Sequence, residues 1–123
     1  MAIYKPERGE SPLWDFPAGT LYKREMASFL ISSFIGWPLI PRTVIREAEH
    51  GVGTLQVFVR ALANENYFSL RSTKKEEICK IFSFDCLINN ADRKGGHCIL
   101  DKAGRVWSID HGLTFHHLPK IRT

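Results

Sequence analysis

The segment from Asn89 to Phe115 constrains the fold more than any other part of the chain. The sequences HCIL at 97–100 and RVWSID at 105–110 are predicted strands on either side of the turn DKAG, so residues 97–110 should form a β-hairpin. A hairpin returns the chain to the edge from which it started. We therefore expect Asp92 and Asp110 to lie near each other despite their separation in sequence.

This predicted cluster has the composition of a metal and phosphate site. His97 follows the flexible pair Gly95-Gly96 and should lie beside the two carboxylates. Mg²⁺ prefers hard anionic oxygen ligands that leave positions for water and substrate phosphates. The cluster therefore predicts a site at which Mg²⁺ bridges phosphate oxygens.

The remaining elements follow from turn residues and periodicity. We predict a strand over 2–5, a helix over 21–35 capped by Thr20, and a hairpin of strands 43–46 and 54–59. Residues 61–72 are mixed in character, with a helical turn as an option, and a T-x-x-E capping box at Thr73 should begin a helix that runs to about Asn89. The apolar residues expected on the buried faces are Tyr22, Met26, Phe29, Leu30 and Phe34 in the first helix and Ile78, Ile81, Phe82, Cys86 and Leu87 in the second.

Composition indicates one globular domain. The 123 residues are 44% hydrophobic and 24% charged, the usual balance of a soluble protein. The three cysteines form no CxxC pair and predict reduced thiols packed as small apolar groups. We recognise no signal peptide and no membrane-spanning run in the sequence. Together with the reduced thiols, these features predict a cytoplasmic protein.

The net charge of +4 suits an anionic partner such as a nucleotide. The basic residues are scattered, however, and the densest stretch, RSTKKEEICK at 71–80, alternates in sign. Such alternation is typical of a solvated helix start. We therefore expect no nucleic-acid partner.

Asp92 in NADRKGGH and Asp110 in SIDHGLTF resemble two aspartates of the phosphatidylinositol 3- and 4-kinase-like family, nearest to the type II phosphatidylinositol 4-kinases and small bacterial relatives. In that family a D-R motif opens the catalytic loop, a β-hairpin follows, and an I-D-x-G-L-x-F segment carries the metal-binding aspartate. The resemblance implies that Asp92 orients the hydroxyl of the phosphate acceptor and that Asp110 binds Mg²⁺. His97 stands where the family usually has asparagine, and we include it in the metal site.

The same resemblance extends to the N-terminal half. Lys5 in AIYKP resembles the strand lysine that holds the α- and β-phosphates of ATP, and Glu25 resembles its ion-pair partner on the next helix. The strand TLQVFV resembles the hinge strand. Backbone groups of Val57, Phe58 and Val59 would then hydrogen-bond adenine.

The resemblance predicts an α+β, partial protein-kinase-like fold in a single domain that looks truncated at both ends. An N-lobe portion at 1–60, a small β-sheet plus a helix without the Gly-rich loop, is joined through 61–72 to a catalytic segment of one helix and a β-hairpin at 73–123. The implied function is Mg²⁺-dependent binding of ATP and phosphoryl transfer to an alcohol on a lipid, protein or small molecule.

Four alternatives stay open. The chain could be a catalytically inactive nucleotide-binding or interaction module, and a homo-oligomer could cover surfaces that a larger lobe would bury. The histidines of DHGLTFHH, with His97 and Cys98, could form the transition-metal site of a hydrolase, although His116 and His117 are adjacent and lack H-x-x-x-H spacing. Asp85 is either a buried structural acid near Asp92 or a solvated helix residue.

Overall fold

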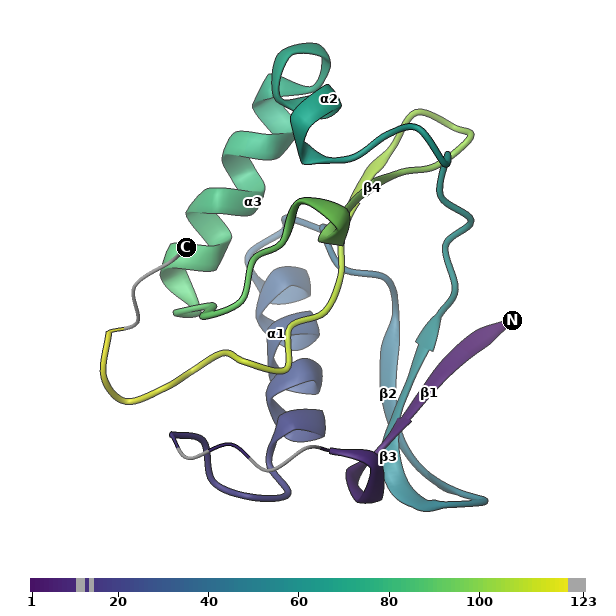
Figure 1. Cartoon of the computed structure of the whole chain (residues 1–123), viewed down its shortest axis with the longest axis vertical. Coiled ribbons are helices and arrows are strands. Elements are labelled where there is room, and N and C mark those ends of the chain that lie inside the picture. The colour runs from purple at the N-terminus through teal and green to yellow at the C-terminus, as the bar shows by residue number, and fades with distance from the viewer. Residues whose placement is uncertain (11–12, 14, 120–123) are drawn as a thin grey trace.

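The computed structural model describes residues 1–10, 13 and 15–119. Within these residues, two small antiparallel sheets and three α-helices form an α+β fold, as predicted. Figure 1 shows the larger sheet beside α1 at one end of the molecule, with α2 and α3 at the other. Segments far apart in sequence therefore meet in the middle of the molecule.

The larger sheet has the strand order β1-β3-β2. Its strands are β1 (Ala2–Pro6), β2 (Thr43–Ala48) and β3 (Gly51–Val57), and Lys5 pairs with Thr54. The predicted hairpin is confirmed, with longer strands and a tighter turn. Gly53 lies opposite Pro6 where β1 pairs with β3. A side chain does not fit there, because a Cβ on residue 53 would lie 2.3 Å from the Lys5 carbonyl oxygen.

The helix α1 spans Leu21–Phe34, close to its predicted bounds. The predicted Thr20 cap is wrong, because the Thr20 hydroxyl donates to the Pro17 carbonyl. The carboxylate of Glu10 instead accepts the backbone N–H groups of Leu21 and Tyr22, at 3.2 and 3.0 Å. Glu10 therefore caps α1 from a separate segment of the chain. Its negative charge also lies at the positive end of the helix dipole, where it is stabilising.

The predicted buried face of α1 is partly wrong. Phe29 packs against the core, but Leu30 and Phe34 are 53% and 87% exposed. The residues that α1 buries are Glu25, Ser28 and Ser32. Small side chains face inward because α1 lies close to β2, β3 and the segment containing Thr114, whose Oγ1 is 3.2 Å from Ser28 Oγ.

Residues 61–72, for which the sequence predicted a helical turn as an option, contain most of a helix. The helix α2 spans Tyr67–Thr73, and the Asn66 side chain accepts the N–H groups of Phe68 and Ser69 in a capping box. Thr73 is the last residue of α2, so the capping box predicted between Thr73 and Glu76 does not form.

The helix α3 spans Lys75–Leu87 and carries the centre of the core. It buries Ile78, Ile81 and Phe84 together with Asp85. The predicted face was partly wrong, because Phe82 and Cys86 are exposed and Leu87 is 63% exposed. The main core cluster comprises Leu39, Ile40, Leu70, Ile78, Ile81, Phe84, Ile88, Cys98 and Val106.

The second predicted hairpin is present and shorter than expected. Its strands are β4 (Cys98–Leu100) and β5 (Val106–Ser108), with Ile99 opposite Trp107. His97 ends a short 3-10 turn before β4. Of the three cysteines, only Cys98 is buried as predicted, and all three are free thiols. No helix in the described part of the chain is long and apolar enough to cross a membrane.

Candidate functional site

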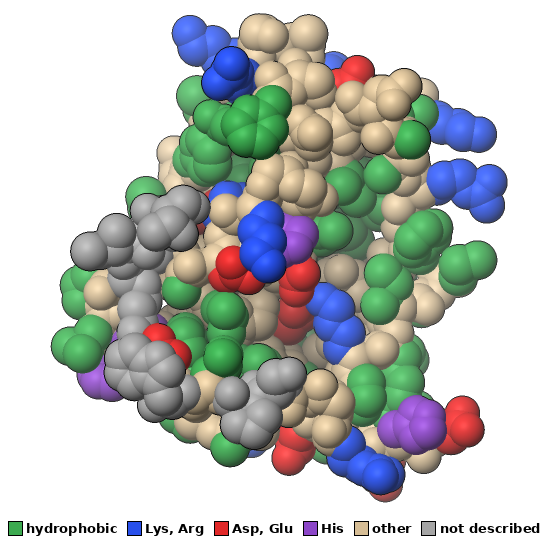
Figure 2. Space-filling model, viewed as in Figure 1, with side chains coloured by type: hydrophobic (Ala, Val, Ile, Leu, Met, Phe, Trp, Pro, Cys, Tyr) green, Lys and Arg blue, Asp and Glu red, His purple; other side chains and the backbone are tan. Residues whose placement is uncertain are grey.

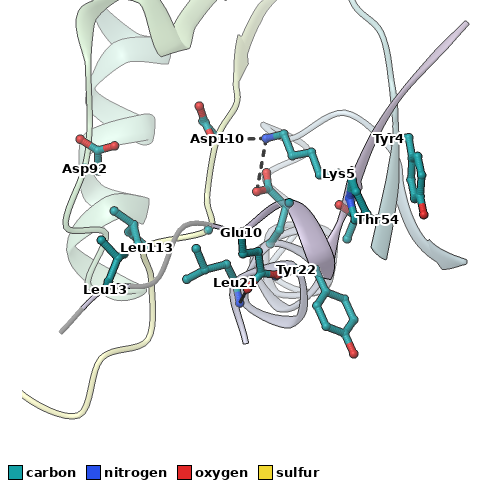
Figure 3. A pocket seen from close by; sticks show the side chains of 14 residues that line it. Tyr4, Lys5, Glu10, Leu13, Leu21, Tyr22, Thr54, Asp92, Asp110 and Leu113 are labelled. Carbon is teal, nitrogen blue, oxygen red and sulfur yellow. Dashed lines mark hydrogen bonds and ion pairs between the residues drawn. The ribbon is translucent and has the colours of Figure 1, made fainter. Parts of the chain in front are cut away.

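An open cavity of about 480 Å³ lies where the sheet, α1 and the two predicted site loops meet. Lys5, Glu25, Asp92 and Asp110 all line it, from four separate segments of the chain (Figure 3). Figure 2 shows acidic side chains gathered with basic and histidine side chains near the middle of this face. The structure therefore brings these four predicted residues to one cavity, whereas the predicted metal ligand His97 does not line it.

Lys5 is the central cation of this cavity. Its Nζ lies 3.2 Å from Asp110 Oδ1 and 3.5 Å from Glu25 Oε2, and its side chain is 39% exposed. Burial alone would lower the pKa of Lys5, but attraction to Glu25 and Asp110 outweighs it and raises that pKa. The ammonium group is thus held charged and pointed into the cavity.

Glu25 anchors this lysine from α1. Its side chain is only 5% exposed, and its second oxygen accepts the backbone N–H of His111 at 3.1 Å. A buried carboxylate needs such partners because an unpaired one would be strongly disfavoured. Glu25 therefore connects the lysine of β1 to the segment that carries Asp110.

Asp110 follows β5 in the left-handed region, with a φ of 67°. Aspartate tolerates this conformation better than most residues. Its Oδ2 lies 3.0 Å from His97 Nε2 and its Oδ1 contacts Lys5. The hydrogen bond with His97 holds the pKa of Asp110 well below its usual range against the opposing effect of burial, and the charge of Lys5 adds to this.

Asp92 reaches the same cavity from the loop that follows α3. Its carboxylate lies 3.7 Å from Lys94 Nζ, and its backbone N–H donates to Asn90 Oδ1 at 3.0 Å. Asp92 and Asp110 both line the cavity, from separate segments of the chain. Lys94 gives the Asp92 carboxylate an exposed counter-ion rather than a buried one.

A buried ion pair between Asp85 and Arg93 contacts the segments that precede β4 and follow β5. From the sequence, Asp85 could be either buried or solvated. Asp85 on α3 forms a salt bridge with Arg93, at 2.7 Å between Oδ2 and Nε. Both side chains are almost fully buried. One sequence feature could have predicted that Asp85 is buried. It lies four residues after Ile81 and one after Phe84, and so on the same face of α3 as these core residues.

His111 was predicted only as part of the alternative transition-metal site. It is fully buried, and its Nε2 lies 3.0 Å from an Arg93 nitrogen and 2.8 Å from Ser108 Oγ. Burial, together with repulsion from Arg93, lowers the pKa of His111 well below its usual value. A guanidinium can only donate, so Nε2 of the neutral ring is the acceptor.

The predicted adenine-binding residues lie at the end of β3 and do not line this cavity. The N–H of Val57 donates to the Arg42 carbonyl, and that of Phe58 donates to the Met1 carbonyl. For the N–H of Val59, no acceptor is found among the described residues. Of these three donors, Val59 is the one that remains for a ligand.

A divalent cation needs several oxygen, nitrogen or sulfur ligands at one place. Nowhere in residues 1–10, 13 and 15–119 do three or more His, Cys, Asp or Glu residues form a group that could hold a metal ion. This gives no support to a zinc cage, whereas Mg²⁺ commonly uses one or two carboxylates together with phosphates and water. Asp110 fits that limited requirement, with its two oxygens shared at present between Lys5 and His97.

His97 bonds to Asp110 rather than presenting a free imidazole to the cavity. Its Nε2 is engaged, and its Nδ1 is buried with no partner in the part of the chain that the structure describes. His116 is also engaged, since its Nε2 bonds the Asp15 carbonyl and its ring stacks on His117.

The fold and site define an α+β protein with one lysine, Lys5, and four carboxylates, those of Glu10, Glu25, Asp92 and Asp110, at one cavity. No protein-family model matches the chain. It is similar to the protein Rv2133c of Mycobacterium tuberculosis, with 36% identity over 156 residues. The match covers 98% of this chain and 56% of the relative, so the chain spans just over half the relative's length. The relative's name states no activity, so any functional argument depends on the site.

Proposed function

We propose that this chain is a protein-kinase-like nucleotide-binding domain, related to the phosphatidylinositol 3- and 4-kinase family, that binds ATP with Mg²⁺ and transfers a phosphoryl group to an alcohol. One observation carries the proposal: Lys5, Glu25 and Asp110 meet at a cavity that Asp92 also lines. A lysine held by a buried glutamate is suited to the α- and β-phosphates as a directed point charge.

Each residue has a distinct role in this proposal. Lys5 attracts the phosphates, and Glu25 keeps it extended toward them. Asp110 supplies the carboxylate for Mg²⁺, which when bound would neutralise charge on the β- and γ-phosphates. Asp92, half-exposed at the cavity wall, would accept or orient the proton of the acceptor hydroxyl.

A bound nucleotide would use the lone pairs of Asp110 that its present contacts leave. Each oxygen of Asp110 has one partner, Lys5 or His97, and keeps a second lone pair that Mg²⁺ could use. The proposed adenine contact would use the Val59 N–H, because those of Val57 and Phe58 are already bonded.

The positive charge of Lys5, 3.2 Å from Asp110 Oδ1, also favours a second candidate. If this contact persists, Lys5 repels a cation at Asp110 while it still attracts an anion to the cavity. The chain would then be a catalytically inactive nucleotide-binding or interaction module.

Calorimetric titration of ATP, with and without Mg²⁺, tests binding. Heat that requires both Mg²⁺ and Asp110, judged with Asp110→Ala, supports the proposed site. Glu76→Gln is the matched control because it removes an exposed carboxylate in the first turn of α3 that does not line the cavity. The absence of heat at millimolar ATP would refute nucleotide binding.

Transfer of labelled γ-phosphate to water or to an added alcohol then separates the two candidates. Label transfer that Asp92→Ala abolishes, with ATP affinity unchanged, identifies a phosphotransferase. Binding by the wild-type protein without transfer identifies the inactive module.

A further inference from the structure

The carboxylate of Asp85 is the shared anchor of two hydrogen-bond arms. Its Oδ2 accepts Arg93 Nε at 2.7 Å, and its Oδ1 accepts another Arg93 nitrogen at 2.8 Å. The same Oδ1 accepts Asn90 Nδ2 at 3.0 Å. A bidentate contact of this kind fixes the plane and the position of the guanidinium.

The first arm leads to Asp92. Asn90 is fully buried, and while its Nδ2 donates to Asp85, its Oδ1 accepts the backbone N–H of Asp92 at 3.0 Å. The orientation of the Asn90 amide, and with it the start of the Asp92 loop, is therefore set by Asp85.

The second arm leads to Asp110 through Arg93. One remaining guanidinium nitrogen donates to the carbonyls of His97 and Ile109, each at 3.3 Å. The other, which also donates to Asp85, has one N–H left for Ser108 Oγ at 2.7 Å and His111 Nε2 at 3.0 Å. Ile109 and His111 flank Asp110, and His97 bonds its carboxylate. Arg93 thus holds the chain on both sides of a residue with a left-handed backbone.

We infer that Asp85 is the positioning residue of this site, which holds Asp92 through Asn90 and Asp110 through Arg93. The two arms begin at one carboxylate, and α3 fixes that carboxylate through the packing of Ile81 and Phe84 in the core. The functional meaning of this inference depends on the proposed function, but the coupling of positions is a property of the fold.

Two variants should separate the arms. Asp85→Asn combined with Arg93→Met removes both buried charges together, which avoids leaving one unpaired, and it retains an amide oxygen for Asn90. Asn90→Ala removes the acceptor for the Asp92 N–H and leaves the contact between Asp85 and Arg93 in place. The first variant should release the Asp110 arm, and the second should release the Asp92 arm.

Residue-resolved amide hydrogen exchange provides the readout, with β3 as an internal reference for general stability. The reporters are the N–H of His111, bonded to Glu25, and the N–H of Asp92, bonded to Asn90. Relative to β3, we expect exchange at Asp92 to become about tenfold faster in Asn90→Ala alone, because this variant removes one hydrogen bond of that N–H. Exchange at His111 should become about tenfold faster in the double variant alone, because the Arg93 contacts that hold its segment are lost.

A purely structural role for Asp85 predicts a different pattern. Equal acceleration at His111, Asp92 and β3, including complete unfolding of either variant, would overturn the inference. Unchanged exchange at both reporters would also overturn it.

Calorimetry with Mg²⁺ and ATP on the same proteins distinguishes this inference from the proposed function. If the wild-type protein binds, the double variant should lose about tenfold in affinity when Mg²⁺ is present, the same factor as its exchange effect. If the wild-type protein does not bind ATP, the proposed function fails, and the exchange pattern still decides the role of Asp85.

Discussion

The ion pair between Lys5 and Glu25 allows a quantitative test of the site's electrostatics. The perturbations are Glu25→Gln, Lys5→Met and the two combined. Glutamine retains an acceptor for the His111 N–H, so the glutamine variant removes mainly the charge. The double-mutant cycle then isolates the free energy of coupling between the two side chains.

The magnitude follows from geometry and exposure. Two charges 3.5 Å apart attract by roughly 5 kcal/mol at an effective dielectric constant of about 20. The net coupling free energy is smaller than this attraction, because Lys5 is partly exposed to water and Asp110 is its second ion-pair partner. Between the values for exposed and for buried pairs, we expect a coupling free energy of about 1 to 2 kcal/mol.

Urea denaturation of the four proteins at neutral pH measures this coupling. Because the pKa of Lys5 is raised in the folded protein, the coupling should be complete below the ordinary lysine pKa of about 10.4 and should fade as the pH rises through the folded value. A coupling within about 0.3 kcal/mol of zero, the usual error of additivity, would show that the pair does not hold Lys5 in place.

Three further predictions concern other parts of the molecule. The pKa of Asp110 is lowered in the folded protein, so its charge should stabilise the fold most above about pH 4. The difference in urea midpoint between wild type and Asp110→Asn should therefore be largest there and shrink as the pH falls toward the folded pKa. A difference that grows in acid would contradict this. Glu10→Ala should cost about 0.5 to 2 kcal/mol by uncapping α1, with faster amide exchange at Leu21 and Tyr22, and unchanged exchange there would refute the cap. Phe84→Ala should cost about 3 to 5 kcal/mol in urea denaturation, because Phe84 is almost fully buried in the core; a loss below about 1 kcal/mol would place it outside the core.

Much of the secondary structure was predictable because it depends on local chemistry. Turn residues and alternating patterns predicted the hairpins that became β2–β3 and β4–β5, and the flanking Gly36 and Pro38 predicted the end of α1. Sequence motifs also named Lys5, Glu25, Asp92 and Asp110, which the structure brings to one cavity. Their proposed roles in nucleotide binding and catalysis stay predictions.

The errors occurred where a partner distant in sequence decided the outcome. Glu10 caps α1 from another segment, and no local pattern at Thr20 reveals this. On α1, apolar periodicity favoured the face with Phe34, whereas the close approach of β2 and β3 selected the face with Ser28 and Ser32. Periodicity shows that a helix has an apolar side, but it does not show which side a neighbour covers.

The sequence by itself determined the order of the elements and the chemical types available to the site, because both depend on residues that are close along the chain. Only the tertiary structure decided that Asp85 is buried and linked to Arg93 and Asn90. Whether a carboxylate on a helix is solvated or serves as a buried anchor depends on the loops that pack against it, and those loops are positioned only when the chain has folded.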